Sequence, residues 1–102
     1  MIEESIRMNH PVVFGASVTK EFTDNYGLET TFDKPNTQNF VGAHAMIVVG
    51  VKKVGNVRMF YIRNSWGKAW GYGGHCWITE NYLGSELCAD FWVPTFIENL
   101  ML

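Results

Sequence analysis

The chain of 102 residues has only two cysteines, Cys76 and Cys88. Two cysteines cannot build a disulfide framework, and neither lies in a Cys-x-x-Cys or paired Cys/His spacing typical of zinc sites. A zinc site made from these cysteines with His44 and His75 would need four ligands from poorly spaced positions to converge. We therefore expect no metal and no cofactor.

The chain also lacks an excess of basic residues, because eight lysines and arginines stand against ten acidic residues for a formal charge of -2. Nucleic acids and anionic membranes attract clustered basic residues, so neither is expected as a partner. The longest apolar run, Ala45 to Val49, is far shorter than the roughly 20 residues that span a bilayer. The start, Met1 to Glu4, has neither the basic end nor the apolar segment of a signal peptide. No residue pattern indicates a compartment.

What the chain does contain is apolar surface, with 47% hydrophobic and 15% aromatic residues. This is enough to offset the entropy of ordering, which excludes a disordered chain. The length fits a single small domain that comprises residues 1–102.

Apolar and polar stretches alternate along the chain and predict an α+β fold, mainly antiparallel β. A short amphipathic start, Ile2 to Asn9, is too short to be a stable isolated helix and suggests a chain cut from something longer. The polar stretch from Thr19 to Asn39 reads as a long surface loop. The glycine-rich stretch from Asn64 to Gly74 reads as a tightly folded loop that displays tryptophans. The expected strands are Pro11 to Val18, the hairpin formed by Ala43 to Val51 and Arg58 to Arg63, His75 to Thr79, and Phe91 to Ile97, with one helical turn between Tyr82 and Leu87.

His44 and Asn64 stand near the ends of the two hairpin strands. His44 follows Gly42 and Ala43, where the backbone can pass close to a ligand and the imidazole can face a cleft. Pairing of the two strands would bring the Asn64 amide oxygen beside the imidazole. A histidine that holds a thiol's proton needs its other ring nitrogen fixed by an acceptor, and a neutral amide orients the ring without a full charge. Trp66 would exclude water from that hydrogen bond and so strengthen it.

The same residues also fit purely structural roles. A lone histidine beside an apolar strand is more often a satisfied structural residue than a catalytic one. On this interpretation Asn64 is a turn residue at a strand end and Trp66 fills the core.

Three motifs in order suggest a family: GAHAMIVVGV (Gly42 to Val51), FYIRNSWG (Phe60 to Gly67) and WGYGG (Trp70 to Gly74). Together they resemble the C-terminal, β-rich half of papain-like cysteine peptidases. Pro11 to Gly15 resembles the first strand of that half, and Asp90 to Trp92 resembles the ending of bacterial-type members. The resemblance covers nearly the whole chain and implies the half-barrel, right-hand domain of that fold.

The resemblance implies roles for individual residues. His44 would be the general base and the imidazolium partner of a thiolate, and Asn64 would orient it. Trp66 would cover their hydrogen bond and line a subsite on the leaving side. The substrate would be a peptide or protein, and its second residue before the scissile bond would meet Gly15, Ala43 and Ala45.

The chain departs from the family in one respect. The family places its nucleophilic cysteine and an oxyanion-hole glutamine in an N-terminal half, and no such motif occurs here. Cys76 falls in a predicted strand, where burial would raise its pKa, and the neighbouring His75 would point to the opposite face. Cys88 is most simply a small core residue. We therefore expect no nucleophile in this chain and no peptidase activity without the missing half.

Two further expectations follow from that absence. The chain could instead be a catalytically inactive papain-like domain that acts as a protein-binding module. In either case the face that the missing half would cover should be unusually apolar. Without that half, we expect the chain to form a homodimer through this face or to be poorly soluble.

Overall fold

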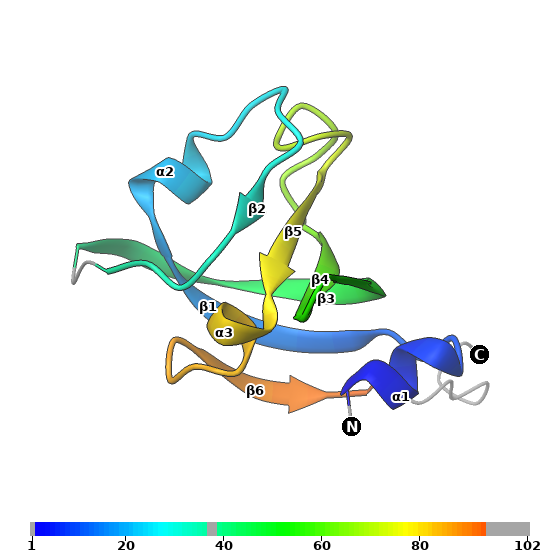
Figure 1. The fold of residues 1–102 in the computed structure, drawn as a ribbon. Coiled ribbons are helices and arrows are strands. Elements are labelled where there is room, and N and C mark those ends of the chain that lie inside the picture. Colours follow the sequence, from blue (N-terminus) through cyan, green and yellow to red (C-terminus); the bar gives the residue numbers. More distant parts are fainter. Residues whose placement is uncertain (1, 37–38, 94–102) are drawn as a thin grey trace, which may run out of the picture.

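The computed structural model describes residues 2–36 and 39–93. In these residues a six-stranded sheet runs in the order β2-β5-β4-β3-β1-β6. Neighbouring strands are antiparallel except β2 and β5, which are parallel. Figure 1 shows the elements, which are α1 (Ile2–Arg7), β1 (Val12–Thr19), α2 (Lys20–Thr23), β2 (Thr31–Phe32), β3 (Phe40–Val54), β4 (Val57–Arg63), β5 (His75–Thr79), α3 (Glu80–Leu83) and β6 (Cys88–Trp92). The mainly antiparallel α+β class predicted from the sequence is confirmed.

One face of the sheet forms the core. Side chains on a strand point alternately to its two faces, and in β1 every second residue is buried. The buried rows of the sheet comprise Val12, Phe14, Ala16, Val18, Met46, Val48, Phe60, Ile62, Cys76, Ile78 and Cys88. The opposite face of β1, β3 and β4 is partly or fully exposed, so the sheet presents a second face with less cover.

The long strand β3 joins the two halves of the sheet. Its first half pairs with β1 as far as Val48, and its second half pairs with β4 from Ile47 onward. The register with β4 shifts between Val48 and Gly50. Gly55, with φ of 61°, opens the two-residue turn into β4, a position where such hairpins need a positive φ. The predicted hairpin is confirmed, with longer strands than expected.

Two expectations about the remaining segments are wrong in part. The stretch from Thr19 to Asn39, predicted as a loop, contains α2 and the short strand β2, which pairs with β5. That pairing joins residues more than 40 positions apart, which local composition cannot reveal. Within the described residues the last strand is β6, Cys88–Trp92, which begins three residues before the predicted start at Phe91 because it pairs with β1 from Cys88 onward. Residues 94–97 lie outside the described residues.

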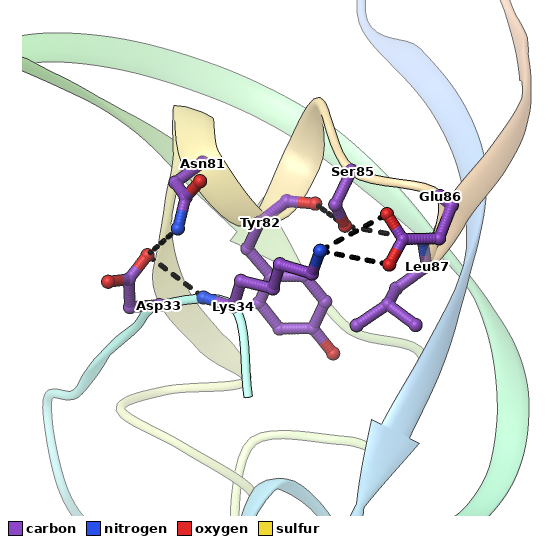
Figure 2. Close-up of polar contacts among 7 residues, drawn as sticks. All are labelled: Asp33, Lys34, Asn81, Tyr82, Ser85, Glu86 and Leu87. Atoms are coloured by element: carbon purple, nitrogen blue, oxygen red, sulfur yellow. Dashed lines mark hydrogen bonds and ion pairs between the residues drawn. The ribbon is translucent and has the colours of Figure 1, made fainter. Parts of the chain in front are cut away.

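A polar clasp, defined here as the contacts of Asp33 and Lys34, fixes the segment that leads into β3 (Figure 2). Asp33 Oδ1 accepts hydrogen bonds from Thr79 Oγ1 at 2.6 Å and Asn81 Nδ2 at 3.1 Å. Lys34 Nζ lies 2.9 Å from a carboxylate oxygen of Glu86. The clasp ties this segment to α3 and to the turn that follows it.

The first helix is held by contacts to the rest of the domain. Ile2 and Ile6 pack against the core, and Glu3 accepts a hydrogen bond from Arg58 Nε of β4 at 3.0 Å. Six residues are too few for a stable isolated helix, so packing against the sheet stabilises α1. None of the helices in residues 2–36 and 39–93 is long and apolar enough to cross a membrane.

Candidate active site

His44 lies on β3, where it pairs with Ala16 of β1. Ala16 belongs to the buried row of β1, and directly paired residues of antiparallel strands share a face, so His44 stands on the core side of the sheet. The imidazole is half-buried. Its ring meets the indole of Trp66 edge to face, with the ring centroids 4.5 Å apart and the planes at 87°.

Trp66 in turn belongs to an aromatic cluster. Its ring contacts Trp70 edge-on at 5.6 Å and Phe22 of α2 at 6.1 Å between centroids. Trp70 is fully buried, and its indole Nε1 donates a hydrogen bond to the carbonyl oxygen of Phe22 at 2.8 Å. Each of these aromatic rings packs against another, so the Trp66 ring that contacts His44 is held in a rigid position.

The loop that carries Trp66 and Trp70 depends on glycine at two positions. Gly71 has φ of 60°, and a Cβ there would overlap the carbonyl oxygen of His75. Gly74 has φ of 85°, and a Cβ there would lie 3.1 Å from the carbonyl oxygen of Gly67. Only glycine meets both demands, so the predicted compact loop is confirmed with a specific reason for its glycines.

Asn64 follows β4 directly and is buried, with 4% of its surface exposed. Its backbone N–H donates to the carbonyl oxygen of Gly74 at 2.9 Å. Its side-chain Oδ1 accepts from the N–H of Ser65 at 2.7 Å, whereas its Nδ2 is buried without a partner. Within the part of the chain that the structure describes, no hydrogen bond joins Asn64 to His44. β3, which carries His44, and β4, which ends just before Asn64, are adjacent and antiparallel, as expected.

The three small residues expected to meet substrate lie on β1 and β3. Gly15 pairs with Ala45, so these two are direct neighbours on one face. Ala43 lies two residues from Ala45 on the same strand and therefore on the same face. His44 lies between Ala43 and Ala45 on β3 but on the opposite face, so the three small residues are not arranged around its ring.

Neither thiol of the chain resembles a nucleophile. Cys76 and Cys88 are both free and buried, and burial raises the pKa of each to about 12. A thiol with such a pKa supplies almost no thiolate at neutral pH. His75, next to Cys76 on β5, stacks on Tyr61 with ring centroids 4.8 Å apart. Within residues 2–36 and 39–93, no group of three or more His, Cys, Asp or Glu side chains is arranged to hold a metal ion.

Gly42 was named from the sequence as a place where the backbone can pass close to a ligand, but its contact with the imidazole was not predicted. A Cβ at Gly42 would lie 3.4 Å from Nε2 of His44, so the bare backbone of Gly42 leaves room for the imidazole. The signal was available in the sequence, because Gly42 and His44 are two apart on a predicted strand and so share a face.

Comparison with known proteins places these features in a family. The model of the papain family cysteine proteases matches residues 1–90. An uncharacterised peptidase C1-like protein of Acanthamoeba polyphaga mimivirus is 30% identical over 95 residues, which cover 90% of this chain and 30% of that protein. Pro-cathepsin H of Mus musculus is 28% identical over 97 residues, which cover 89% of this chain and 28% of that protein.

Among solved structures, xylellain, a cysteine protease from Xylella fastidiosa, matches with a TM-score of 0.76 and 33% identity. The match covers 91% of this chain and 35% of that one. The chain thus spans about a third of the length of these relatives. With a family model that matches most of its length and a fold shared with a bacterial cysteine protease, the chain belongs to the papain family of cysteine proteases.

Proposed function

We propose that this chain supplies the histidine and asparagine of a cysteine-peptidase active site that cleaves peptides or proteins. The observation that carries the proposal is the seating of the His44 imidazole edge-on against Trp66, because this contact fixes the ring in one plane. The thiol comes from polypeptide outside this chain, since Cys76 and Cys88 are buried with raised pKa values.

In this mechanism His44 takes the proton of the incoming thiol and stays beside the thiolate as an imidazolium. The thiolate attacks the carbonyl carbon of the scissile bond, and His44 returns the proton to the leaving amine as the C–N bond breaks. Water then attacks the thioester, with His44 again as base, and releases the acid while the thiol is restored.

Asn64 is the residue proposed to orient the imidazole. Its Oδ1 already accepts one hydrogen bond, from the N–H of Ser65, and a carbonyl oxygen has a second lone pair. In the assembled site a ring N–H of His44 would donate to that lone pair. Trp66 would shield the resulting bond and line the leaving-side subsite.

Gly15, Ala43 and Ala45 are proposed to line the pocket for the substrate's second residue before the scissile bond. Gly15 and Ala45 are paired across β1 and β3, and none of the three has a side chain beyond Cβ. They therefore leave open space on this face of the sheet for a substrate side chain.

A chimeric enzyme tests the catalytic proposal. The segment of xylellain that this chain matches is replaced by this chain, and hydrolysis of a fluorogenic peptide is measured. We expect activity that falls by about 100-fold or more in His44→Ala, the usual contribution of general acid–base catalysis. Lys53→Ala, at the exposed end of β3, is the control that keeps activity. An active chimera in which His44→Ala has no effect would contradict the proposal.

A second candidate function is a catalytically inactive papain-like module that binds a protein partner. Two observations favour it: neither thiol is accessible, and the described residues contain no hydrogen bond between His44 and Asn64. In that case the chimera folds and stays inactive. Sedimentation of the isolated chain tests the accompanying proposal of a homodimer through the less covered sheet face, since a monomer at micromolar concentration excludes it.

A further inference from the structure

Ser17 lies beside the residues proposed to line the pocket for the substrate's second residue before the scissile bond. Between β1 and β3, Gly15 pairs with Ala45 and Ser17 pairs with Ala43. Directly paired residues share a face of the sheet, and so do residues two apart on one strand. These four residues therefore form one pocket floor. The hydroxyl of Ser17 is the polar side-chain group of this floor, because glycine and alanine have none.

The backbone of Ser17 is fixed on the side away from β3. Its N–H donates a hydrogen bond to the carbonyl oxygen of Leu87 at 2.8 Å, and its carbonyl oxygen accepts one from the hydroxyl of Tyr82 at 2.6 Å. Tyr82 is itself buried. In an antiparallel pair, residues whose backbone groups point away from the partner strand bring their side chains closest together. The Ser17 side chain is therefore held beside Ala43.

The Ser17 hydroxyl makes no hydrogen bond within residues 2–36 and 39–93. The hydroxyls of Thr79 and Ser85, by contrast, both donate hydrogen bonds at 2.6 Å. Ser17 is half-buried, and the fully buried side-chain atom without a partner in the described part of the chain is Nδ2 of Asn64. The Ser17 hydroxyl is therefore open to water or to a ligand on the pocket side.

A second polar group borders the pocket floor at Gly15. On its other side, Gly15 pairs with Ala89 of β6. A Cβ placed on Gly15 would have the carbonyl oxygen of Ala89 as its nearest non-adjacent atom, at 3.8 Å, so the space above Gly15 is open. A carbonyl oxygen has two lone pairs and can accept a further hydrogen bond even when the strand ladder uses one. The open space is therefore bordered by a hydroxyl on one side and by a hydrogen-bond acceptor on the other.

We infer that Ser17 is a specificity-determining residue that selects a carboxamide side chain, Asn or Gln, as the substrate's second residue before the scissile bond. A carboxamide carries an oxygen that accepts hydrogen bonds and an NH₂ group that donates them. Its oxygen would accept from the Ser17 hydroxyl, and its NH₂ group would donate to the carbonyl oxygen of Ala89. The inference rests on the proposed function, because it assigns a substrate class to the pocket proposed there.

The chemistry of the pocket floor disfavours other substrate side chains. An aliphatic side chain such as Leu would cover the Ser17 hydroxyl and remove its hydrogen bond to water without supplying another. A carboxylate could accept from Ser17, but it would lie near the Ala89 carbonyl oxygen and find no cation among the four floor residues. A cationic side chain would likewise find no carboxylate among those four. An uncharged amide matches both polar groups.

Peptide binding to the ¹⁵N-labelled chain tests the inference by NMR. The probes are acetyl-Ala-Asn-Ala-amide and two matched peptides, one with Leu, which has nearly the same shape, and one with Lys in place of Asn. We expect saturable shifts at the amides of Gly15, Ser17 and Ala43, with binding at least about threefold tighter for the Asn peptide than for the Leu peptide. A hydrogen bond to a partly exposed hydroxyl gives a gain of this size.

Three variants make the test specific. Ser17→Ala should bring the Asn and Leu peptides to equal binding, whereas Ser17→Thr, which retains a hydroxyl, should keep the preference. Ser5→Ala, the matched change on α1, should also keep it. Dispersed spectra confirm that each variant is folded. The inference would be overturned by a preference that persists in Ser17→Ala, by equal binding of the Asn and Leu peptides to the original chain, by tighter binding of the Lys peptide, or by an absence of shifts at Gly15 and Ala43.

His44→Ala separates this inference from the proposed function. His44 stands on the opposite face of β3 from the pocket floor, so this variant should lose activity in the chimera and keep the preference for the Asn peptide. An inactive chimera, built with a chain that still prefers the Asn peptide, would contradict the proposed catalytic role and leave the role of Ser17 in place.

Discussion

The imidazole of His44 and the indole of Trp66 meet at right angles with their centroids 4.5 Å apart. This contact links the strand that carries the histidine to the glycine-rich loop, and through Trp70 to the core. The position of the histidine is therefore set by residues more than 20 positions further along the chain.

Replacing Trp66 by alanine should loosen His44 and destabilise the domain. Because Trp66 is half-buried, we expect the free energy of unfolding to fall by about 2 kcal/mol, below the range for a fully buried tryptophan. The His44 ring protons should also lose the ring-current shift of the indole in the NMR spectrum. Trp92→Ala, at a site with 57% exposure, is the control and should change neither the unfolding free energy nor the His44 resonances by much. Unchanged His44 resonances in Trp66→Ala would contradict the contact.

Substituting Gly42 by alanine should displace the imidazole with little effect on stability. The new Cβ would lie 3.4 Å from Nε2, so the ring must move by a few tenths of an ångström. We expect altered His44 ring resonances and a change in unfolding free energy below about 1 kcal/mol. Val41→Ala, at the neighbouring exposed position, should leave those resonances in place. Identical His44 spectra for Gly42→Ala and the original chain would show that the ring does not occupy this space.

Gly71, in the loop that carries the tryptophans, and Gly55, in the turn between β3 and β4, form a matched pair of positions for substitution. Both have positive φ, 60° and 61°, but a Cβ at Gly71 would overlap the His75 carbonyl whereas nothing lies within 4 Å at Gly55. We expect Gly55→Ala to cost about 1 kcal/mol for the left-handed conformation alone. Gly71→Ala should cost at least about 2 kcal/mol more, because the backbone must move. Similar melting temperatures for the two variants would refute the close approach.

The buried thiols should be unreactive in the folded chain. Burial raises the pKa of Cys76 and Cys88 to about 12, so little thiolate exists at about pH 8. We expect iodoacetamide to label neither cysteine in buffer and both in denaturant, as read by intact mass. Rapid labelling of Cys76 in the folded chain would reopen its assignment as a core residue.

The sequence was informative where a signal was local. The strand His75–Thr79 was predicted with its observed bounds, because its apolar residues directly follow Gly73 and Gly74. The two apolar runs on either side of Gly55 and Asn56 predicted the hairpin, and the dense glycines after Asn64 predicted the compact loop. The clasp of Asp33 with Thr79, and the pairing of β2 with β5, could not be predicted, since each joins segments about 46 residues apart whose partners are polar or short.

The clasp at Asp33 should make stability depend on pH in the acid range. Hydrogen bonds from Thr79, Asn81 and the N–H of Lys34 hold the pKa of Asp33 below the ordinary value of an aspartate carboxyl. A depressed carboxyl pKa contributes stability above the unfolded value, and that contribution is lost as pH falls through the folded value. This contribution is measured as the free energy of unfolding in urea, followed by fluorescence at a series of pH values from about pH 7 to about pH 2.

Asp33→Asn should therefore lose part of its stability at neutral pH and show a flatter dependence below about pH 4 than the original chain. Glu29→Gln, on the exposed loop before β2, is the matched control and should keep the original slope. Because the carboxylate of Asp33 is largely solvated, the difference should be a fraction of the total stability and should persist in salt, since hydrogen bonds and not a distant charge produce it. If the unfolding free energies of Asp33→Asn and the original chain changed with pH in parallel, the Asp33 carboxylate would not be a source of pH-dependent stability.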